Sequence, residues 1–108
     1  MKFYEMEIEE EAAAEVVRKI KAKEEFDEEE LQNLRWYFGE FDEVYGDNRR
    51  WTRSVTTIFK FGDNIFVALE WEEGLTEYQP NEYYEQPYFV YPKEEYIVVT
   101  NWYRKEDE

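Results

Sequence analysis

The sequence predicts an α+β fold in which two N-terminal helices pack on one face of an antiparallel sheet of three to five strands. The first half of the chain places apolar residues at helical spacing, whereas the second half alternates apolar and polar residues with the period of a strand. A chain of 108 residues supports one hydrophobic core. Aromatic residues make up 20% of it and provide apolar surface that a disordered chain with this net charge of −15 would lack. We therefore expect a single domain over residues 1–108.

Two helices are expected in the first half, after a short strand at residues 2–8, where apolar and polar residues alternate weakly. From Glu9 the chain is rich in Ala, Glu and Lys, which are good helix formers. The apolar stripe of this first helix is Ala13, Val16, Val17 and Ile20. Asp27 as N-cap and Glu30 at N3 predict the start of a second helix, which ends near Gly39. The side chains that the second helix would bury are Leu31, Leu34, Phe38 and Phe41.

A β-hairpin is expected after the helices. Residues 51–61 alternate between β-branched or aromatic residues and more polar ones, which predicts a strand. Gly62-Asp63-Asn64 then predicts a tight turn into a second strand over residues 65–72, and Glu73-Gly74 ends that strand.

The last third of the chain predicts a loop and two further strands. Residues 75–87 contain Pro80 and Pro87 and are expected to form an irregular loop. Strands are expected at residues 88–91 and 96–103, with a turn at Pro92, Lys93 and Glu94 between them. From Arg104 onward the chain is expected to fray.

Composition excludes several kinds of chemistry. Without Cys or His the chain has no Cys/His zinc site, disulfide, thiol nucleophile or Ser-His-Asp triad. Residues 42–48 are rich in oxygen ligands but lack the spacing and the closing Glu of a calcium loop. A pair of carboxylates can always be chosen from 28 acidic residues, so such a pair does not indicate a glycosidase. We expect no enzymatic activity, no cofactor and no metal site.

We find no signal segment and no membrane-spanning segment in the sequence. Its N-terminus turns acidic at once and has no apolar run of signal length, and no stretch approaches the length of a membrane span. We therefore expect a cytoplasmic protein without a membrane partner.

Charge is distributed in blocks. Residues 1–47 carry a net charge of −10, residues 48–69 carry +3 and residues 70–95 carry −7. Carboxylates three or four positions apart on a helix approximate the charge spacing of a phosphate backbone, so they are expected to attract the basic groove of a nucleic-acid-binding protein. The alternative is a solvated helical face. The acidic candidates for partner contact are Glu28, Glu29, Glu40, Asp42, Glu43 and Asp47.

The predicted loop interleaves aromatic residues with carboxylates and amides. Its acidic background would repel phosphates, which disfavours direct binding of nucleic acid. Tyr and Trp beside carboxylates suit the Arg or Lys side chains of a protein partner. The alternative is that the aromatic residues cap the core of the sheet. The candidate loop contacts are Glu73, Glu77, Tyr78, Glu82, Tyr83 and Tyr84.

A short basic stretch precedes the first strand of the hairpin and contains Arg49, Arg50 and Arg53. We expect these arginines to pair with the acidic helices across the fold. The alternative is a local site for an anion or for an acidic patch on a partner.

The hairpin and the loop carry a resemblance to a known group of proteins. The segments that carry it are Arg50-Trp51-Thr52-Arg53-Ser54, Trp71 to Glu77, Gln79, Asn81 to Tyr84 and Gln86-Pro87. They resemble a group of small acidic proteins from phages and prophages of Gram-positive bacteria, over about residues 48–90. The resemblance implies a phage setting. In size and acidity the chain is similar, as a class, to phage inhibitors of host defence, including anti-CRISPR proteins and DNA-mimic anti-restriction proteins.

These observations predict a non-enzymatic phage inhibitor. It would bind the basic nucleic-acid-binding surface of a host defence protein, with a Cas9-type nuclease as the first example to test. One alternative is a module for a small molecule, in which Arg50 and Arg53 hold an anionic ligand such as a nucleotide signal. Another is an oligomeric phage assembly protein, including a homodimer, that pairs through the strand edge at residues 96–103.

Overall fold

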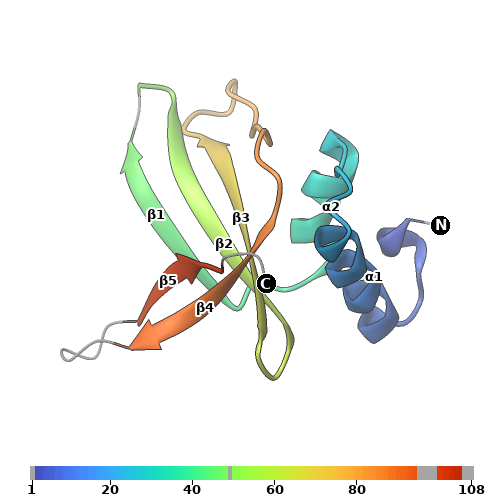
Figure 1. Ribbon diagram of the computed structural model, residues 1–108. Coiled ribbons are helices and arrows are strands. Elements are labelled where there is room, and N and C mark those ends of the chain that lie inside the picture. Colours follow the sequence, from blue (N-terminus) through green and yellow to red (C-terminus); the bar gives the residue numbers. More distant parts are fainter. Residues whose placement is uncertain (1, 49, 95–99, 106–108) are drawn as a thin grey trace.

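The computed structural model describes residues 2–48, 50–94 and 100–105. These residues form two α-helices, a short 3-10 helix and one antiparallel sheet with the strand order β1-β2-β3-β4-β5 (Figure 1). The helices are η1 Phe3–Glu5, α1 Glu9–Lys21 and α2 Glu28–Tyr37. The strands are β1 Asp42–Asn48, β2 Thr52–Gly62, β3 Ile65–Gly74, β4 Tyr88–Glu94 and β5 Thr100–Arg104. The predicted α+β class and antiparallel sheet are confirmed. In this part of the chain no helix has the length and apolar character needed to cross a membrane.

The N-terminal segment forms a 3-10 turn, so the predicted strand at residues 2–8 is wrong. The backbone N–H of Lys2 donates to Glu5 Oε1 at 2.8 Å and closes this turn. Phe3 is buried, and its ring stacks on Phe38 with centroids 5.7 Å apart. Burial of this one aromatic ring, rather than pairing with a strand, therefore fixes the segment.

Both predicted helices are present. Asp27 caps α2 as expected: its carboxylate accepts from the backbone N–H of Glu30 at 2.8 Å, and Glu30 accepts from the backbone N–H of Asp27 at 3.0 Å. The expected burial of Phe41 is wrong, because α2 ends at Tyr37 and the chain then extends into β1, leaving Phe41 53% exposed.

The β2–β3 hairpin is present with the predicted turn. Gly62 pairs with Ile65, and Thr52 pairs with Gly74 at the far end. Strand β1 was not predicted, and it pairs antiparallel with β2. Its mostly polar sequence carries little strand propensity, so pairing with β2 determines its conformation.

Strand β4 is longer than predicted. It continues through Pro92 and Lys93, where the sequence predicts a turn. Proline is accommodated because the pairing of β4 with β3 ends at Val90, so β3 requires no N–H from Pro92. Arg104 belongs to β5 and pairs with Val90, so fraying does not begin there. Residues 95–99 and 106–108, which include the start of the predicted last strand, lie outside the described residues.

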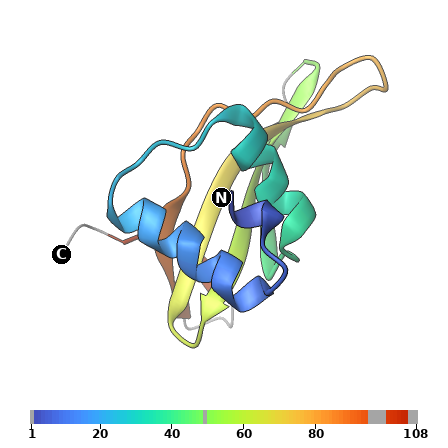
Figure 2. The same ribbon diagram turned by 90° about the vertical axis from the view of Figure 1, so that its right-hand side faces the viewer.

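Buried side chains gather in two clusters. The larger one contains Val16 of α1 and Leu34 of α2 together with Phe59 of β2 and Leu69 of β3. Figure 2 shows both helices in front of the central strands. The smaller cluster contains Ile58 of β2, Phe66 and Ala68 of β3 and Val90 of β4, and its members on β2 and β3 alternate with those of the first cluster.

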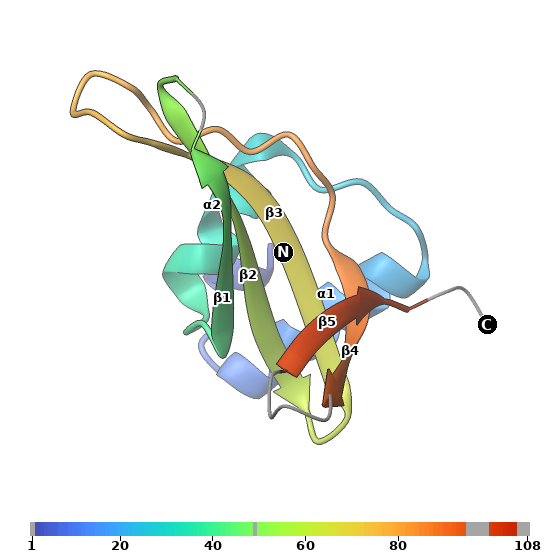
Figure 3. The ribbon, with the colours of Figure 1, turned by 90° about the vertical axis from the view of Figure 1, so that its left-hand side faces the viewer.

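The sheet is curled. Strands β1 and β5 lie at opposite edges of the strand order, yet the curl brings them toward each other (Figure 3). Trp102 Nε1 of β5 donates to Asp42 Oδ2 of β1 at 2.7 Å. Trp102 also packs on Phe66, with ring centroids 5.1 Å apart. The curl thus covers the smaller cluster with side chains from the edge strands.

Candidate acidic interaction surface

A hollow of about 410 Å³ lies between the hairpin and the loop that follows it. Its lining residues are Thr52, Ser54, Glu70, Trp71, Glu72, Glu82, Tyr84 and Glu85. Four of them are glutamates, and none of the described lining residues is Lys or Arg. We call this feature the acidic hollow.

Strand periodicity and one isolated bridge build the acidic hollow. Glu70 and Glu72 lie two residues apart on β3, so their side chains share one face of the strand. The loop returns to this strand because the backbone groups of Glu72 and Glu82 exchange two hydrogen bonds of 2.9 Å. Glu82 and Tyr84 therefore lie beside the strand carboxylates.

Hydroxyl groups donate to the carboxylates of the acidic hollow. Thr52 Oγ1 donates to Glu72 at 2.9 Å, and the Tyr88 hydroxyl donates to Glu70 at 2.7 Å. Burial, together with the bond to Glu70, raises the pKa of Tyr88 well above its ordinary value of 10. These bonds hold the carboxylates of Glu70 and Glu72 in place.

The N-terminal turn of α2 lies within electrostatic range of the acidic hollow. Tyr84 donates its hydroxyl to Glu82, and this bond is the main reason that the pKa of Tyr84 is raised. The charges of Glu72 and Glu28 raise it further. Glu28, a predicted helical contact, thus acts on Tyr84 through its charge but is not among the residues that line the acidic hollow.

A second group of carboxylates lies where α2 leads into β1. The carboxylate of Glu43 lies close enough to Glu40 to raise the pKa of Glu40. Burial opposes ionisation of Glu43, but hydrogen bonds from Tyr45, Glu40 and Thr57 outweigh it and hold the pKa of Glu43 below its ordinary value. The Tyr45 hydroxyl lies 2.7 Å from Glu43 and Thr57 Oγ1 lies 3.0 Å from it. Two carboxylates in contact favour the approach of a cation.

The acidic residues from Glu40 to Asp47 lie outside the helices. Asp42, Glu43 and Asp47 belong to β1, which corrects their expected place on a helical face. Only Glu28 and Glu29 of the six acidic candidates lie on a helix. Glu29 accepts a hydrogen bond from the Tyr4 hydroxyl, which raises the pKa of Tyr4 to about 12.

Tyr83 is not available to a partner, which corrects its predicted role. It is 7% exposed, and its ring stacks on Trp71 with centroids 5.6 Å apart. Arg35 lies over the Trp71 ring at 3.9 Å and donates to the Tyr83 hydroxyl at 3.1 Å. At this position the alternative holds: a loop aromatic residue caps the core. Tyr78 and Tyr84, in contrast, are exposed.

The described arginines of the basic stretch, Arg50 and Arg53, do not meet the helices as expected. Arg53 pairs with Glu73, which lies directly opposite it in the β2–β3 register. Its guanidinium also lies over the Tyr45 ring, 4.2 Å from the centroid. Arg50 lies over Trp51 at 5.0 Å. Arg49 lies outside the described residues.

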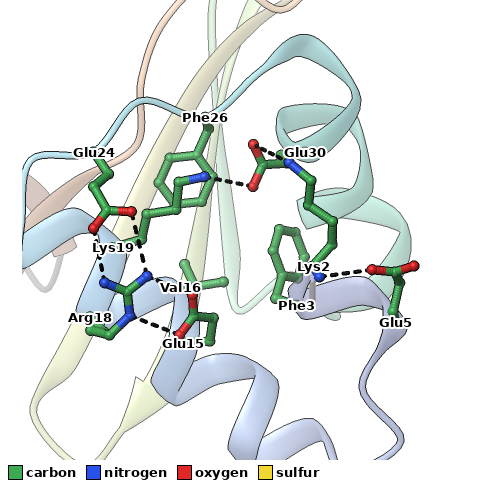
Figure 4. A pocket seen from close by; sticks show the side chains of 10 residues that line it. All are labelled: Lys2, Phe3, Glu5, Glu15, Val16, Arg18, Lys19, Glu24, Phe26 and Glu30. Atoms are coloured by element: carbon green, nitrogen blue, oxygen red, sulfur yellow. Dashed lines mark hydrogen bonds and ion pairs between the residues drawn. The ribbon is translucent and has the colours of Figure 1, made fainter.

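A second hollow, of about 440 Å³, contains acids that are already paired (Figure 4). Glu30 Oε2 lies 2.7 Å from Lys19 Nζ, and Glu30 Oε1 lies 3.3 Å from Lys2 Nζ. Arg18 bridges Glu15 and Glu24 at its rim. This network joins the N-terminal segment, α1 and α2, so we assign it a structural role.

Sequence reasoning found some residues of the acidic hollow and missed others. Glu82 and Tyr84 line it, whereas Asp47, Glu77 and Tyr78 do not. Glu70, Glu72 and Glu85 were missed. The signal for the first two was present, because they alternate with Leu69 and Trp71 and so belong to the opposite face of the strand. No group of three or more acidic side chains in the described part of the chain is arranged to hold a metal ion.

Comparison with known proteins yields no relative. The chain matches no protein-family model, no curated protein and no solved structure.

Proposed function

We propose that this protein is a non-enzymatic inhibitor, encoded by a phage and active in the cytoplasm of the bacterial host. It binds the basic nucleic-acid-binding surface of a host defence protein, and a Cas9-type nuclease is the first partner to test. The observation that carries the proposal is the acidic hollow, where Glu82 and Tyr84 of the loop lie beside Glu70 and Glu72 of β3.

The chemistry of the acidic hollow favours an arginine or lysine of the partner. A guanidinium that enters it meets several carboxylates and forms charge-assisted hydrogen bonds with them. The exposed ring of Tyr84 offers a face for stacking of the same group. Because nucleic acid uses the same basic side chains, occupation of them by this protein excludes nucleic acid.

Docking of the helices on one face of the sheet is part of the proposal, because it holds Glu28 near the loop. Support comes from the hydrophobic cluster shared by α1, α2, β2 and β3. Gln86 of the loop also exchanges two hydrogen bonds with the backbone of Phe26, at 2.7 and 3.0 Å, directly before α2. A surface held in place in this way loses little conformational entropy on binding.

A competition assay at two salt concentrations tests this function. A labelled guide RNA or DNA duplex is bound to the purified nuclease, and this protein is titrated in. We expect displacement of the nucleic acid, with a potency that falls as salt is raised, because the contacts are electrostatic. Binding that leaves the nucleic acid in place, or that is insensitive to salt, contradicts the proposal.

Matched charge variants locate the contact. We expect Glu82→Gln with Glu85→Gln to weaken inhibition about tenfold or more, because both carboxylates line the acidic hollow. The control is Glu7→Gln with Glu10→Gln, which removes the same charge from exposed positions outside the hollow. Equal losses in both pairs would mean that net charge, and not this surface, determines binding.

A further inference from the structure

An exposed apolar cluster lies at one end of the molecule. Its members are Trp51, Leu75 and Tyr78, which are 52%, 40% and 87% exposed, and we call them the aromatic tip. The backbone N–H of Leu75 donates to the carbonyl of Trp51 at 2.9 Å, which joins the start of β2 to the loop after β3. Figures 2 and 3 show these two segments extending together from the same end. Exposed apolar side chains on neighbouring segments are a common feature of interaction sites.

The loop that carries Tyr78 has a defined shape. It folds back so closely on Gly74 that a Cβ added there would lie 1.8 Å from the carbonyl oxygen of Gln79. The backbone N–H of Gln79 also donates to the carbonyl of Thr76 at 3.1 Å. The aromatic tip is thus held in place before any partner binds, so binding costs little conformational entropy.

Charge at the aromatic tip differs from charge elsewhere on the chain. Arg50 lies over the Trp51 ring at 5.0 Å, and the exposed Glu77 immediately precedes Tyr78. The described part of the aromatic tip therefore carries charges of both signs. A strongly basic partner is opposed here by Arg50, and an acidic partner is repelled by the whole molecule. A surface that carries both a positive and a negative charge can form ion pairs with the same surface of a second copy.

We propose that two copies of this chain associate through the aromatic tip around a two-fold axis. Trp51, Leu75 and Tyr78 form the apolar centre, and Arg50 of each copy pairs with Glu77 of the other. This contact also lets two copies of net charge −15 meet through a small area that includes a base from each copy. The association does not depend on the proposed inhibitor function.

Sedimentation across a dilution series, from micromolar to millimolar protein, tests the association. We expect a dimer that tightens as salt is raised, because salt screens the repulsion between two acidic copies. Binding to a basic partner has the opposite salt dependence, so failure of either proposal is recognised separately. Trp51→Ala should weaken the dimer about thirtyfold. Trp36→Ala is the matched control, because Trp36 of α2 is 74% exposed and lies outside the aromatic tip.

Charge reversal gives a second test that does not disturb packing. Arg50→Glu alone and Glu77→Arg alone should each weaken the dimer about tenfold, and an equimolar mixture of the two variants should restore it. Glu77→Arg also lowers the net charge from −15 to −13, so simple repulsion predicts a tighter dimer for this variant. Tighter association of Glu77→Arg, a chain that stays monomeric throughout, or equal effects of Trp51→Ala and Trp36→Ala would each overturn the proposal.

Discussion

At the scale of single residues, Arg35 helps to hold one loop residue, Tyr83, in the core, whereas the next residue, Tyr84, is exposed. Arg35 is the only base within α2, and it turns inward over Trp71 and donates to the Tyr83 hydroxyl. Trp71 Nε1 in turn donates to Thr57 Oγ1 at 2.9 Å. Glu28 and Glu29 of the same helix are exposed. Because Arg35 is directed inward, no base of α2 lies beside these two exposed glutamates.

This division of the loop could not be read from the sequence. Tyr83 and Tyr84 are adjacent and have similar neighbours along the chain, yet only Tyr83 is buried. The difference comes from Trp71 and from Arg35, which is 48 residues away. Glu30 is a related case, because the sequence predicts its role in the capping box but not its burial between Lys2 and Lys19.

Glu30 gives a prediction for pH dependence. Burial opposes its ionisation, but Lys19, the backbone of Asp27 and Lys2 outweigh this and hold the pKa of Glu30 below its ordinary value of 4.5. A depressed pKa stabilises the fold above pH 4.5, and this contribution is lost as the pH falls through the folded-state pKa. We expect Glu30→Gln to cost about 2 kcal/mol at pH 7 and much less at pH 3. Urea unfolding of both proteins at the two pH values measures this difference, and a loss independent of pH would contradict it.

At the scale of elements, the sequence predicted those helices and strands whose ends are marked by a local capping or turn motif. Asp27 and Glu30 determine where α2 begins, and Gly62-Asp63-Asn64 determines the hairpin. Strand β1 has no such signal, because its conformation depends on hydrogen bonds to β2 that form only in the tertiary fold. The same applies to the acidic hollow, where Glu82 reaches Glu72 through one isolated bridge.

The contact between the two edge strands gives a prediction at this scale. Trp102→Phe keeps an aromatic ring against Phe66 but removes the hydrogen bond to Asp42. We expect a loss of about 1 kcal/mol in the free energy of unfolding and faster amide exchange in β1 and β5. Asp42→Ala, Trp102→Phe and the double variant complete a double-mutant cycle, and additive losses would show that the two side chains do not interact.

At the scale of the whole molecule, two electrostatic effects oppose each other. The ion pairs of Arg18 with Glu15 and Glu24 involve exposed or partly exposed charges and weaken when salt is added. Repulsion within a chain of 28 acidic and 13 basic residues also weakens with salt, and this favours the compact state. Because 15 acidic charges have no base to balance them, we expect repulsion to be the larger effect.

The melting temperature should therefore rise as sodium chloride is added at pH 7, with most of the rise at low concentration, where the screening length changes most. Glu7→Gln, Glu10→Gln and Glu25→Gln together remove three exposed charges and reduce the net charge to −12. We expect this variant to melt at a higher temperature than the parent in low salt and to gain less from added salt. Sucrose serves as the control, because it stabilises both proteins by exclusion from their surface without screening charge. A melting temperature that falls with salt would mean that the ion pairs outweigh the repulsion, and the acidic surface would then carry no cost to stability that binding to a cationic partner could relieve.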